Sequence, residues 1–447
     1  MHVTIKKLVV SLACAGLCGS AFSLDLMQAW RLALDQDATI KASRAATDSR
    51  KERVPQAYSQ LLPNVSANFS RNKNDLTTVQ PDFLGQASTS EQRYFSAGKT
   101  LTLRQPLYRP FQTASYDQAK SQVEDALALL ERDTQNVAVR VAGAYFEALL
   151  ASDQLVLIEA QRQAVLTQLD AAKKGFAAGA GVRTDIDEAQ ARLDLVVAQS
   201  LEARQNVELT RRQLEIMVNE PVGDLAILDA GKLNLSLPDP ETVEGWIEKA
   251  EQTSPEIRSL TAQVETARLE IDKARAGHKP TLDFIAQRSR SESENVTRVQ
   301  SSFDNTTFGL QLAIPLYGGG YVSSTVRQAE AELERAQYAL EAGKRDLALR
   351  VNREFRGVSE GVLRVKALEQ ALRSVELLAT STRKSLQAGS RTIVDVLNTE
   401  QQKAAAARDL SQARYLYLVS QVRLFALAGE IDEKQMQAIN DLLANKL

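Results

Sequence analysis

The sequence predicts a mainly α-helical protein with a β-barrel part, built from two structural repeats. Ala, Leu, Gln, Glu and Arg dominate its 447 residues, which is the composition of long helices and coiled coils. Short segments in which apolar and polar residues alternate occur at matching places in both halves of the chain, and a period of two indicates strands. The order of these features in the first half recurs in the second half.

Matching motifs define the repeat. Leu62-Pro63-Asn64-Val65 resembles Lys279-Pro280-Thr281-Leu282, and Phe176-Ala-Ala-Gly179 resembles Leu386-Gln-Ala-Gly389. Because several such pairs follow one another in the same order, chance is a poor explanation. We therefore expect each half to form the same arrangement of helices and strands.

The first repeat is expected to span residues 24–218. Pro63 should end an initial helix, since proline lacks the N–H that a helix interior needs. A hairpin of strands should follow, with a polar linker at about 72–95 between them. The expected elements are an initial helix at about 25–61, strands at about 63–71 and 97–107, and long helices at about 110–175 and 184–218.

The second repeat is expected to span residues 241–430 and to follow the same plan. A linker at 219–240, rich in Gly, Pro and Asp, should join the repeats, and residues 431–447 should form a C-terminal tail. The expected elements are an initial helix at about 240–277, strands at about 280–288 and 306–315 with a polar linker at about 289–304, and long helices at about 322–386 and 392–428.

The third of the long helices carries a coiled-coil seam. Its apolar residues step by three and four from Val326 to Leu347, and the pattern resumes at Phe355 after a stutter. At a rise of 1.5 Å per residue, a helix of about 65 residues is about 100 Å long.

Residues 1–23 at the N-terminus have the pattern of a secretory signal peptide. Lys6 and Lys7 precede a short apolar run, and Ala21-Phe22-Ser23 supplies the small residues that a signal peptidase needs. Both cysteines, Cys14 and Cys18, lie inside this segment, so the mature chain should have no thiol chemistry.

Composition excludes several function classes. His278 is the only histidine after the signal, so catalysis or metal binding by histidine pairs has no residues to use. We expect no enzyme activity, no metal and no cofactor. The formal net charge of −2 offers no electrostatic footprint for nucleic acid.

Any membrane role should use strands, because no run of about 18 apolar residues follows the signal. Four strands cannot close a barrel, and open sheet edges are prohibitive in lipid. Several copies of the chain must therefore pool their strands. Eight strands would leave an interior filled by side chains, whereas larger barrels leave a water-filled lumen.

Three motifs carry a family resemblance. They are Gly389-Ser-Arg-Thr-Ile-Val-Asp-Val-Leu397, Pro315-Leu-Tyr-Gly-Gly-Gly320, and the Ala-rich helix from Ala413 to Gly429. On these motifs the chain resembles the TolC-like outer membrane factor family, also called outer membrane efflux proteins, over nearly its whole mature length. It is most similar to the TolC branch.

The resemblance implies a homotrimer with a 12-stranded barrel in the outer membrane, continued by an α-helical tunnel across the periplasm. It implies a passive exit duct for type I protein secretion, multidrug efflux, or both. The implied partners are outer-membrane lipid, a periplasmic adaptor (a membrane fusion protein) and an inner-membrane pump of the ABC or RND type.

The resemblance also implies functional residues at the helical tips. Asp395 matches the first acidic residue of the family's pore constriction, and three copies would form an acidic ring whose repulsion raises the pKa of some members. Asn398 stands where a second aspartate is typical, so we expect a weaker cation block. Another interpretation of Asp395 is a capping box with Thr392, and both can hold together.

Other tip residues have implied roles in gating and docking. Arg391 matches a gate-locking arginine, and Asp185, which follows Thr184, matches its partner on the other hairpin tip. Solvated charges at a loop and a helix start are the alternatives. We expect Gly175, Gly179 and Gly181 to end the first long helix of the first repeat, and Gly389 to end the first long helix of the second repeat. The resemblance implies that adaptors dock at these turns.

Two rival functions remain. A periplasmic adaptor also has a long helical hairpin, but it would have one hairpin flanked by β-rich domains. A structural coiled-coil protein would not need alternating strands at matching points of a repeat.

Overall fold

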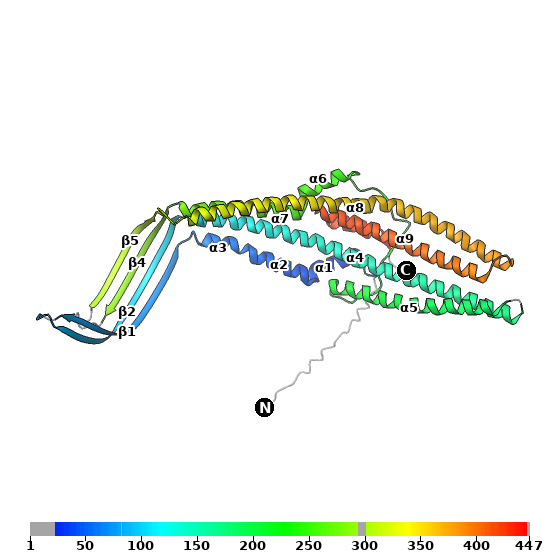
Figure 1. Ribbon diagram of the computed structural model, residues 1–447, viewed down its shortest axis with the longest axis horizontal. Helices are drawn as coiled ribbons and strands as arrows, with labels where there is room; N and C mark the ends of the chain where they lie inside the picture. Colours follow the sequence, from blue (N-terminus) through cyan, green and yellow to red (C-terminus); the bar gives the residue numbers. More distant parts are fainter. Residues whose placement is uncertain (1–22, 82, 180, 294–300, 445–447) are drawn as a thin grey trace, which may run out of the picture.

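The computed structural model describes residues 23–81, 83–179, 181–293 and 301–444. All but the last residue of the predicted signal peptide lies outside this range. A β-sheet occupies one end of an elongated molecule, and helices extend from it to the opposite end (Figure 1).

Short helices lead into each strand hairpin. The first set is α1 (Leu26–Gln36), α2 (Ala38–Lys51) and α3 (Arg53–Ser59), and the second is α6 (Val243–Thr253), α7 (Pro255–Arg275) and the 3-10 helix η1 (Ala276–His278). The prediction of one continuous helix in each place was wrong. Asp37 interrupts the first by capping α2, where its carboxylate accepts the Thr39 N–H at 2.6 Å. Pro255 interrupts the second, because the residue before a proline avoids helical backbone angles.

Four long helices form two hairpins. They are α4 (Pro110–Ala177), α5 (Arg183–Val218), α8 (Tyr321–Gln387) and α9 (Ile393–Leu427). The 68 residues of α4 correspond to about 100 Å of helix. The α4–α5 and α8–α9 turns both lie at the end of the molecule farthest from the sheet (Figure 1). These turns are called the helical tips below.

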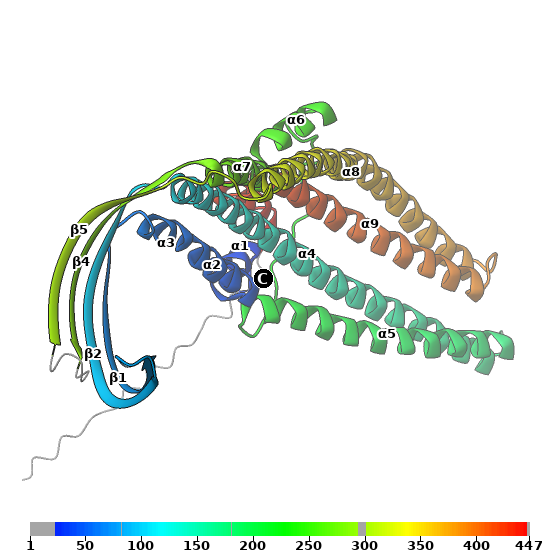
Figure 2. The ribbon, with the colours of Figure 1, turned by 60° about the vertical axis from the view of Figure 1, so that its left-hand side comes forward.

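The sheet is antiparallel, with the strand order β1-β2-β4-β5. Its strands are β1 (Asn64–Pro81), β2 (Ala87–Tyr108), β4 (Thr281–Ser293) and β5 (Ser301–Ala313). They curve together away from the helices (Figure 2).

The strands are longer than the sequence predicted in the first hairpin. The polar stretch at 72–95, predicted as a linker, pairs as strand from Asn72↔Ser96 to Pro81↔Ala87. Backbone hydrogen bonds form a ladder whatever the side chains are, so a polar stretch without apolar alternation can still be a strand. In the second hairpin residues 289–293 and 301–304 are also strand, and residues 294–300 lie outside the described range.

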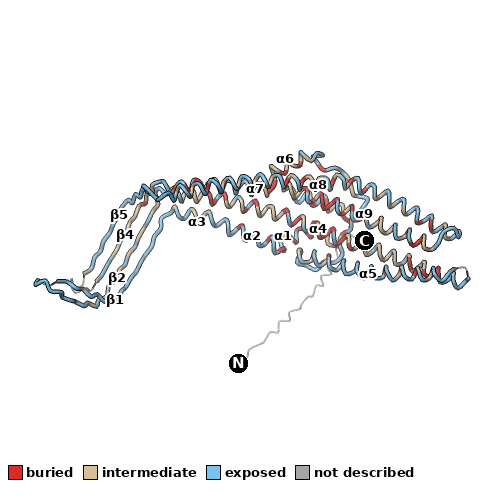
Figure 3. The backbone as a smooth tube through the Cα atoms, viewed as in Figure 1, coloured by how far each residue is buried: buried red, intermediate tan, exposed pale blue. Residues whose placement is uncertain are grey.

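One face of the sheet is apolar near the helices. Phe69, Phe308 and Leu310 are 76%, 71% and 68% exposed. The opposite face carries Ser, Thr, Asn and Gln at the paired positions, such as Ser66↔Thr102 and Thr102↔Gln287. The strands lack a buried face within the single chain (Figure 3). Such a sheet needs lipid on one side and water on the other.

A buried ion cluster joins the sheet to the long helices. Asp283 in β4 is 2% exposed and accepts from Arg104 Nε at 2.9 Å and from Arg109 Nε at 2.8 Å. Arg104 lies in β2, and Arg109 immediately precedes α4. A buried carboxylate that keeps its charge needs such partners, so the cluster fixes the strands relative to the first long helix.

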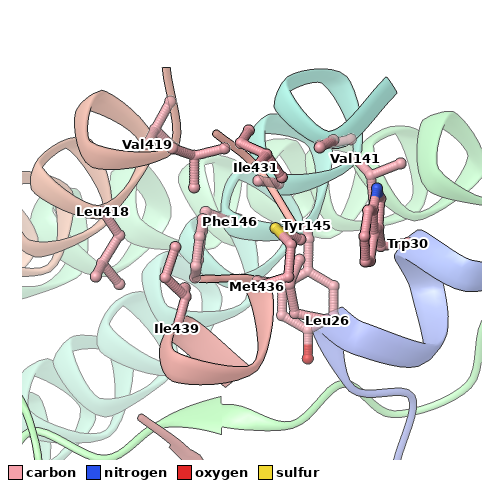
Figure 4. Packing of buried hydrophobic residues seen from close by; sticks show 14 of the residues in the cluster. Leu26, Trp30, Val141, Tyr145, Phe146, Leu418, Val419, Ile431, Met436 and Ile439 are labelled. Carbon is pink, nitrogen blue, oxygen red and sulfur yellow. The ribbon is translucent and has the colours of Figure 1, made fainter. Parts of the chain in front are cut away.

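The main core lies midway along the helices. Leu26, Trp30, Tyr145, Phe146 and Met436, from α1, α4 and α10 (Glu433–Asn440), are buried together there (Figure 4). The Tyr145 hydroxyl donates to the carbonyls of Leu24 at 2.8 Å and Ala226 at 3.0 Å.

The chain segments expected as linker and tail meet in this region. β3 (Ile227–Leu228) lies in the former and pairs with β6 (Leu443–Ala444) in the latter. Val222 and Leu443 are both buried in the main core. These two segments therefore pack against the main core in the middle of the molecule.

A polar contact between α4 and α9 also lies in this middle region. The Tyr415 hydroxyl donates to Asp153 Oδ2 at 2.8 Å, and the Tyr415 ring stacks on Phe146 with centroids 5.8 Å apart. Burial raises the pKa of the Asp153 carboxyl, although the hydrogen bonds from Tyr415 and Ser411 and the charge of Arg414 oppose this shift.

α4 is long and apolar enough, by length and composition, to cross a membrane. No such segment was predicted from the sequence. However, 44% of the apolar window is buried, and the core helix of a soluble protein passes the same test. Val141, Tyr145 and Leu149 of α4 are buried in the main core, which accounts for the apolar composition.

Candidate functional site at the helical tips

Glycines shape both tips. Gly179 and Gly389 have φ of +72° and +74°, the left-handed conformation that glycine adopts at least cost. The Gly389 N–H donates to Leu386 O at 3.0 Å and the Ser390 N–H donates to Ser385 O at 2.9 Å, which together form a Schellman motif.

The other two glycines have different settings. Gly181 N–H donates to Gly175 O at 3.1 Å, and a Cβ on Gly181 would lie 3.0 Å from Phe176 N. Gly175 lies inside α4, which ends at Ala177. The prediction that Gly175 ends this helix was therefore wrong.

Asp395 forms a capping box at the start of α9. Its carboxylate accepts the Thr392 N–H at 2.9 Å, and the Thr392 hydroxyl accepts the Asp395 N–H at 3.2 Å. These bonds satisfy two donors that the first turn of a helix leaves free. The capping-box interpretation is confirmed.

The capping bonds also set the charge state of Asp395. Hydrogen bonds from the Thr392 backbone and side chain, together with the charge of Arg391, lower the pKa of the Asp395 carboxyl. Arg391 Nη1 lies 3.8 Å from Asp395 Oδ1. The acidic ring itself requires several copies and stays a prediction.

Asn398 lies one turn after Asp395 and contacts the other hairpin. Its Oδ1 accepts from Arg192 Nη2 of α5 at 3.0 Å, and Arg192 Nη1 donates to Gln401 Oε1 at 2.8 Å. Arg192 also lies 3.2 Å from Glu188 on its own helix. Thus one guanidinium connects the two helical hairpins beside the tips.

Arg192 was not predicted from the sequence. Its spacing offered a signal, since Asp185, Glu188 and Arg192 step by three and four along one face of α5. The acceptors on α9 are neutral amides about 200 positions away in the chain. A search for opposite charges three or four residues apart therefore does not identify them.

The predicted pair of Arg391 and Asp185 is not formed within the described part of the chain, where Arg391 pairs with Asp395. Asp185 lies in the first turn of α5, and its N–H donates to Val182 O at 3.2 Å. Thr184 lies beside it in the same turn, which begins at Arg183. A link between Arg391 and Asp185 would have to join two copies of the chain.

A small apolar cluster supports the tips from behind. Val165 and Leu169 of α4, Ala189 of α5 and Leu397 of α9 are buried together. Beyond this cluster the same helices border a cavity of about 680 Å³ whose lining includes Gln161, Gln199 and Arg408. Near the tips the two hairpins therefore meet through this small apolar cluster and through the hydrogen bonds of Arg192.

Across the described ranges, no group of His, Cys, Asp and Glu side chains is arranged to hold a metal ion. The tips bring carboxylates, guanidinium groups and amides together. Such an arrangement can attract or exclude charged solutes and can hold two helices together.

Comparisons with known proteins agree with this geometry. The sequence profile of the family described as outer membrane efflux protein matches residues 29–220 and 246–430. The Proteases secretion protein PrtF of Dickeya chrysanthemi is 32% identical over 434 residues, which cover 97% of this chain and 93% of PrtF. The Outer membrane protein TolC of Vibrio cholerae is 29% identical over 444 residues, which cover 98% of each chain.

A solved structure shows the same fold. The CmeC outer membrane channel of Campylobacter jejuni superposes with a TM-score of 0.77 at 15% identity, over 94% of this chain and 89% of that one. At this identity the likeness concerns the fold alone.

Proposed function

The chain belongs to the outer membrane efflux protein family, and from this membership we propose that three copies assemble into one passive duct. The protein is the outer-membrane exit duct of a tripartite export system, and it extends into the periplasm. Channel proteins of this kind work with a periplasmic adaptor and an inner-membrane pump.

The sheet supports the proposed homotrimer. Each chain supplies four strands with free edges at β1 and β5, and closure is the way to remove edges in lipid. Three copies give a barrel of twelve strands, and its size leaves room for a lumen where eight strands would not. The exposed apolar residues of the outer face carry this proposal, because nothing else in the described part of the chain covers them.

We assign the duct primarily to protein secretion. The names of PrtF and of the Alkaline protease secretion protein AprF, each 32% identical to this chain, describe export of proteases. Small-molecule efflux is the second candidate, which the similarity to TolC proteins supports. In either case the pump supplies the energy, and the duct performs no chemistry.

The helical tips are the gated entrance in this proposal. Asp395 from three copies forms an acidic ring, and Asn398 in place of a second acid makes the cation block weaker. Arg391, Thr184 and Asp185 link neighbouring copies at the closed entrance. The turns that contain Gly175, Gly179, Gly181 and Gly389 dock the adaptor, whose binding separates the hairpins.

Single-channel conductance of the mature protein in planar bilayers tests the duct. We expect a small, cation-preferring conductance that loses its preference in Asp395→Ala. A conducting protein that is indifferent to this substitution keeps the duct and removes Asp395 as its selectivity element. A folded oligomer without conductance contradicts the duct and favours an adaptor or a structural coiled-coil protein.

A further inference from the structure

The two faces of the sheet differ in charge. On the polar face, the one that includes Ser66, Thr102 and Gln287, Arg104 and Asp283 are the charged residues among the described positions, and they pair with each other. The other charges of the strands lie on the opposite face, the one with the apolar residues. Apart from this one ion pair, the charge of the described strands therefore lies on the face that is apolar near the helices.

The charges of the outer face are not spread evenly. Near the helices its rungs are apolar, as in Val65↔Leu103 and Leu103↔Ala286. From the Leu101↔Arg288 rung outward come five exposed cations against two carboxylates, Glu292 and Asp304. The next rungs of this face add one cation, Arg93, and two carboxylates, Asp75 and Glu91. We call the five cations the basic belt: Arg71, Lys73, Lys99, Arg288 and Arg290.

Two members of the basic belt directly face each other. Lys99 of β2 is paired in register with Arg290 of β4, and both are exposed. Like charges at directly opposite positions destabilise a sheet. An anion placed between them would remove this cost. The carboxylates against Arg290 come from Asp304, in register on the β5 side, and from Glu292, which forms an ion pair with it.

The existing ion pairs do not neutralise the belt. Arg290 Nε lies 2.9 Å from Glu292 Oε1 and Arg288 Nη2 lies 3.1 Å from Asp304 Oδ2, each in exposed positions. Arg71 lies over the Phe95 ring at 5.4 Å. Lys73 and Lys99 form no ion pair with any described residue. The belt therefore keeps a net positive charge, which three copies would multiply.

The belt begins in the outer part of the apolar band, at Arg288 beside Leu101, and ends beyond the band at Arg71 and Lys73. Arg71 follows the exposed Phe69 by two residues, which is about 7 Å along a strand. Arg71 lies farther from the helices than Phe69, because β1 begins at Asn64 beside the helices and runs outward (Figure 1). Since the helices extend into the periplasm, the outer boundary of the band faces the outer leaflet. Long basic side chains at such a boundary reach the headgroup layer.

We propose that the basic belt is a binding surface for phosphate-bearing glycolipid headgroups of the outer leaflet. The arginines would hold phosphate through paired N–H donors, and the lysines would act as point charges. This proposal rests on the proposed function, which places the sheet in the outer membrane. Its new content is that the outer face binds lipids that carry phosphate. Lys99 and Arg290 form its centre.

Lipid titration of the full mature protein in zwitterionic detergent, followed by native mass spectrometry, tests this proposal. The probe is a diphosphorylated lipid A, compared with its dephosphorylated form. Removal of both charges by Lys99→Gln with Arg290→Gln should weaken binding of the phosphorylated probe by about tenfold or more, since each charge-assisted contact corresponds to about one decade. Binding of the dephosphorylated form should not change.

Controls separate the alternatives. The charge-keeping Lys99→Arg should bind as the wild type does, and so should Arg268→Gln, which removes an exposed charge from α7. Conductance of each variant in planar bilayers shows that the duct still inserts. A conducting double variant with wild-type affinity for the phosphorylated probe overturns the proposal. So does equally tight binding of inorganic phosphate, because the belt would then select a soluble anion.

Discussion

Arg192 of α5 donates a hydrogen bond to Asn398 of α9 at 3.0 Å, and this contact joins the two helical hairpins beside their tips. The same guanidinium reaches Gln401 at 2.8 Å. Both acceptors are neutral, so the contact can break without leaving a charge buried. Because the guanidinium donor is charged, each such bond contributes about 1.5–3 kcal/mol, an amount that the proposed opening of the tips can overcome.

Replacement of Arg192 should therefore loosen the entrance. Arg192→Ala is expected to increase the single-channel conductance or the open fraction in planar bilayers, because α5 loses its two hydrogen bonds to α9. Arg183→Ala is a matched control, since Arg183 pairs with Asp187 within α5 at 3.6 Å. If both variants conduct as the wild type does, the Arg192 contact does not restrain the tips.

Asn398 should share this effect with Arg192. Because the two side chains make one hydrogen bond, the increases caused by Arg192→Ala and Asn398→Ala should not add in the double variant. Conductance of the two single variants and the double variant measures the coupling. Additive increases would show that each residue acts through separate partners.

Two substitutions of Asp395 can separate its capping role from its charge. Asp395→Asn keeps a side-chain oxygen that can accept the Thr392 N–H, whereas Asp395→Ala removes both acceptor and charge. We expect both variants to lose cation preference, but only the alanine variant to lose thermal stability. If Asp395→Asn keeps the full cation preference, residues other than Asp395 determine the selectivity.

The pH dependence of cation preference tests the same carboxylate. Hydrogen bonds from Thr392 lower the pKa of Asp395 below the ordinary 3.8. A depressed folded-state pKa means that the charge and its stabilising contribution persist above 3.8 and disappear as the pH falls through the lowered value. Reversal potentials measured from about pH 7 to about pH 3 should show this persistence. Loss of preference well above pH 3.8 would mean that repulsion in the acidic ring outweighs the cap.

Asp153 should make the protein less stable as the pH rises, which is opposite to the effect of Asp395. Burial raises the pKa of its carboxyl, so the folded protein holds a proton that the unfolded chain releases. Stability then falls as the pH rises from the unfolded pKa, ordinarily 3.8, through the raised folded value. Asp153→Asn, which can still accept from Tyr415, should remove this loss.

Thermal unfolding of the detergent-solubilised protein between about pH 3.5 and about pH 8 measures the effect. The Asn variant should match the wild type at the acidic end and exceed it at neutral pH. Tyr415→Phe removes a hydroxyl donor that lowers the pKa of Asp153, so it should lower stability by about 1 kcal/mol at the acidic end and by more at neutral pH. An Asp153→Asn protein that is less stable than the wild type at neutral pH would mean that the charge is needed there.

Local patterns in the sequence predicted much of this architecture. The period of three and four residues marks the long helices, and Pro63 and Pro280 lie at the two helix-to-strand junctions. The Thr392 and Asp395 spacing of a capping box also appears in the structure as hydrogen bonds. These features depend on neighbours within one or two turns, which a sequence displays directly.

Features that depend on distant partners were not predictable in the same way. The outer halves of β1 and β2 have no apolar alternation, and only their pairing makes them strands. Pairing of β3 with β6 joins residues more than 200 positions apart. The contact of Arg192 with Asn398 is equally distant, and its acceptor has no charge that would indicate a partner.

The tip glycines should respond in opposite directions to alanine. Gly389 has φ of +74°, a conformation in which a Cβ is strained, so Gly389→Ala should destabilise the hairpin by about 1 kcal/mol. Gly175 lies inside α4, and a Cβ there would meet no atom within 4 Å. Gly175→Ala should therefore stabilise the helix by about 0.5–1 kcal/mol. Urea unfolding followed by circular dichroism measures both changes. Equal stability of the two variants would mean that the turn accommodates the new methyl group of Gly389→Ala without strain. The left-handed conformation of Gly389 would then not be required for this turn.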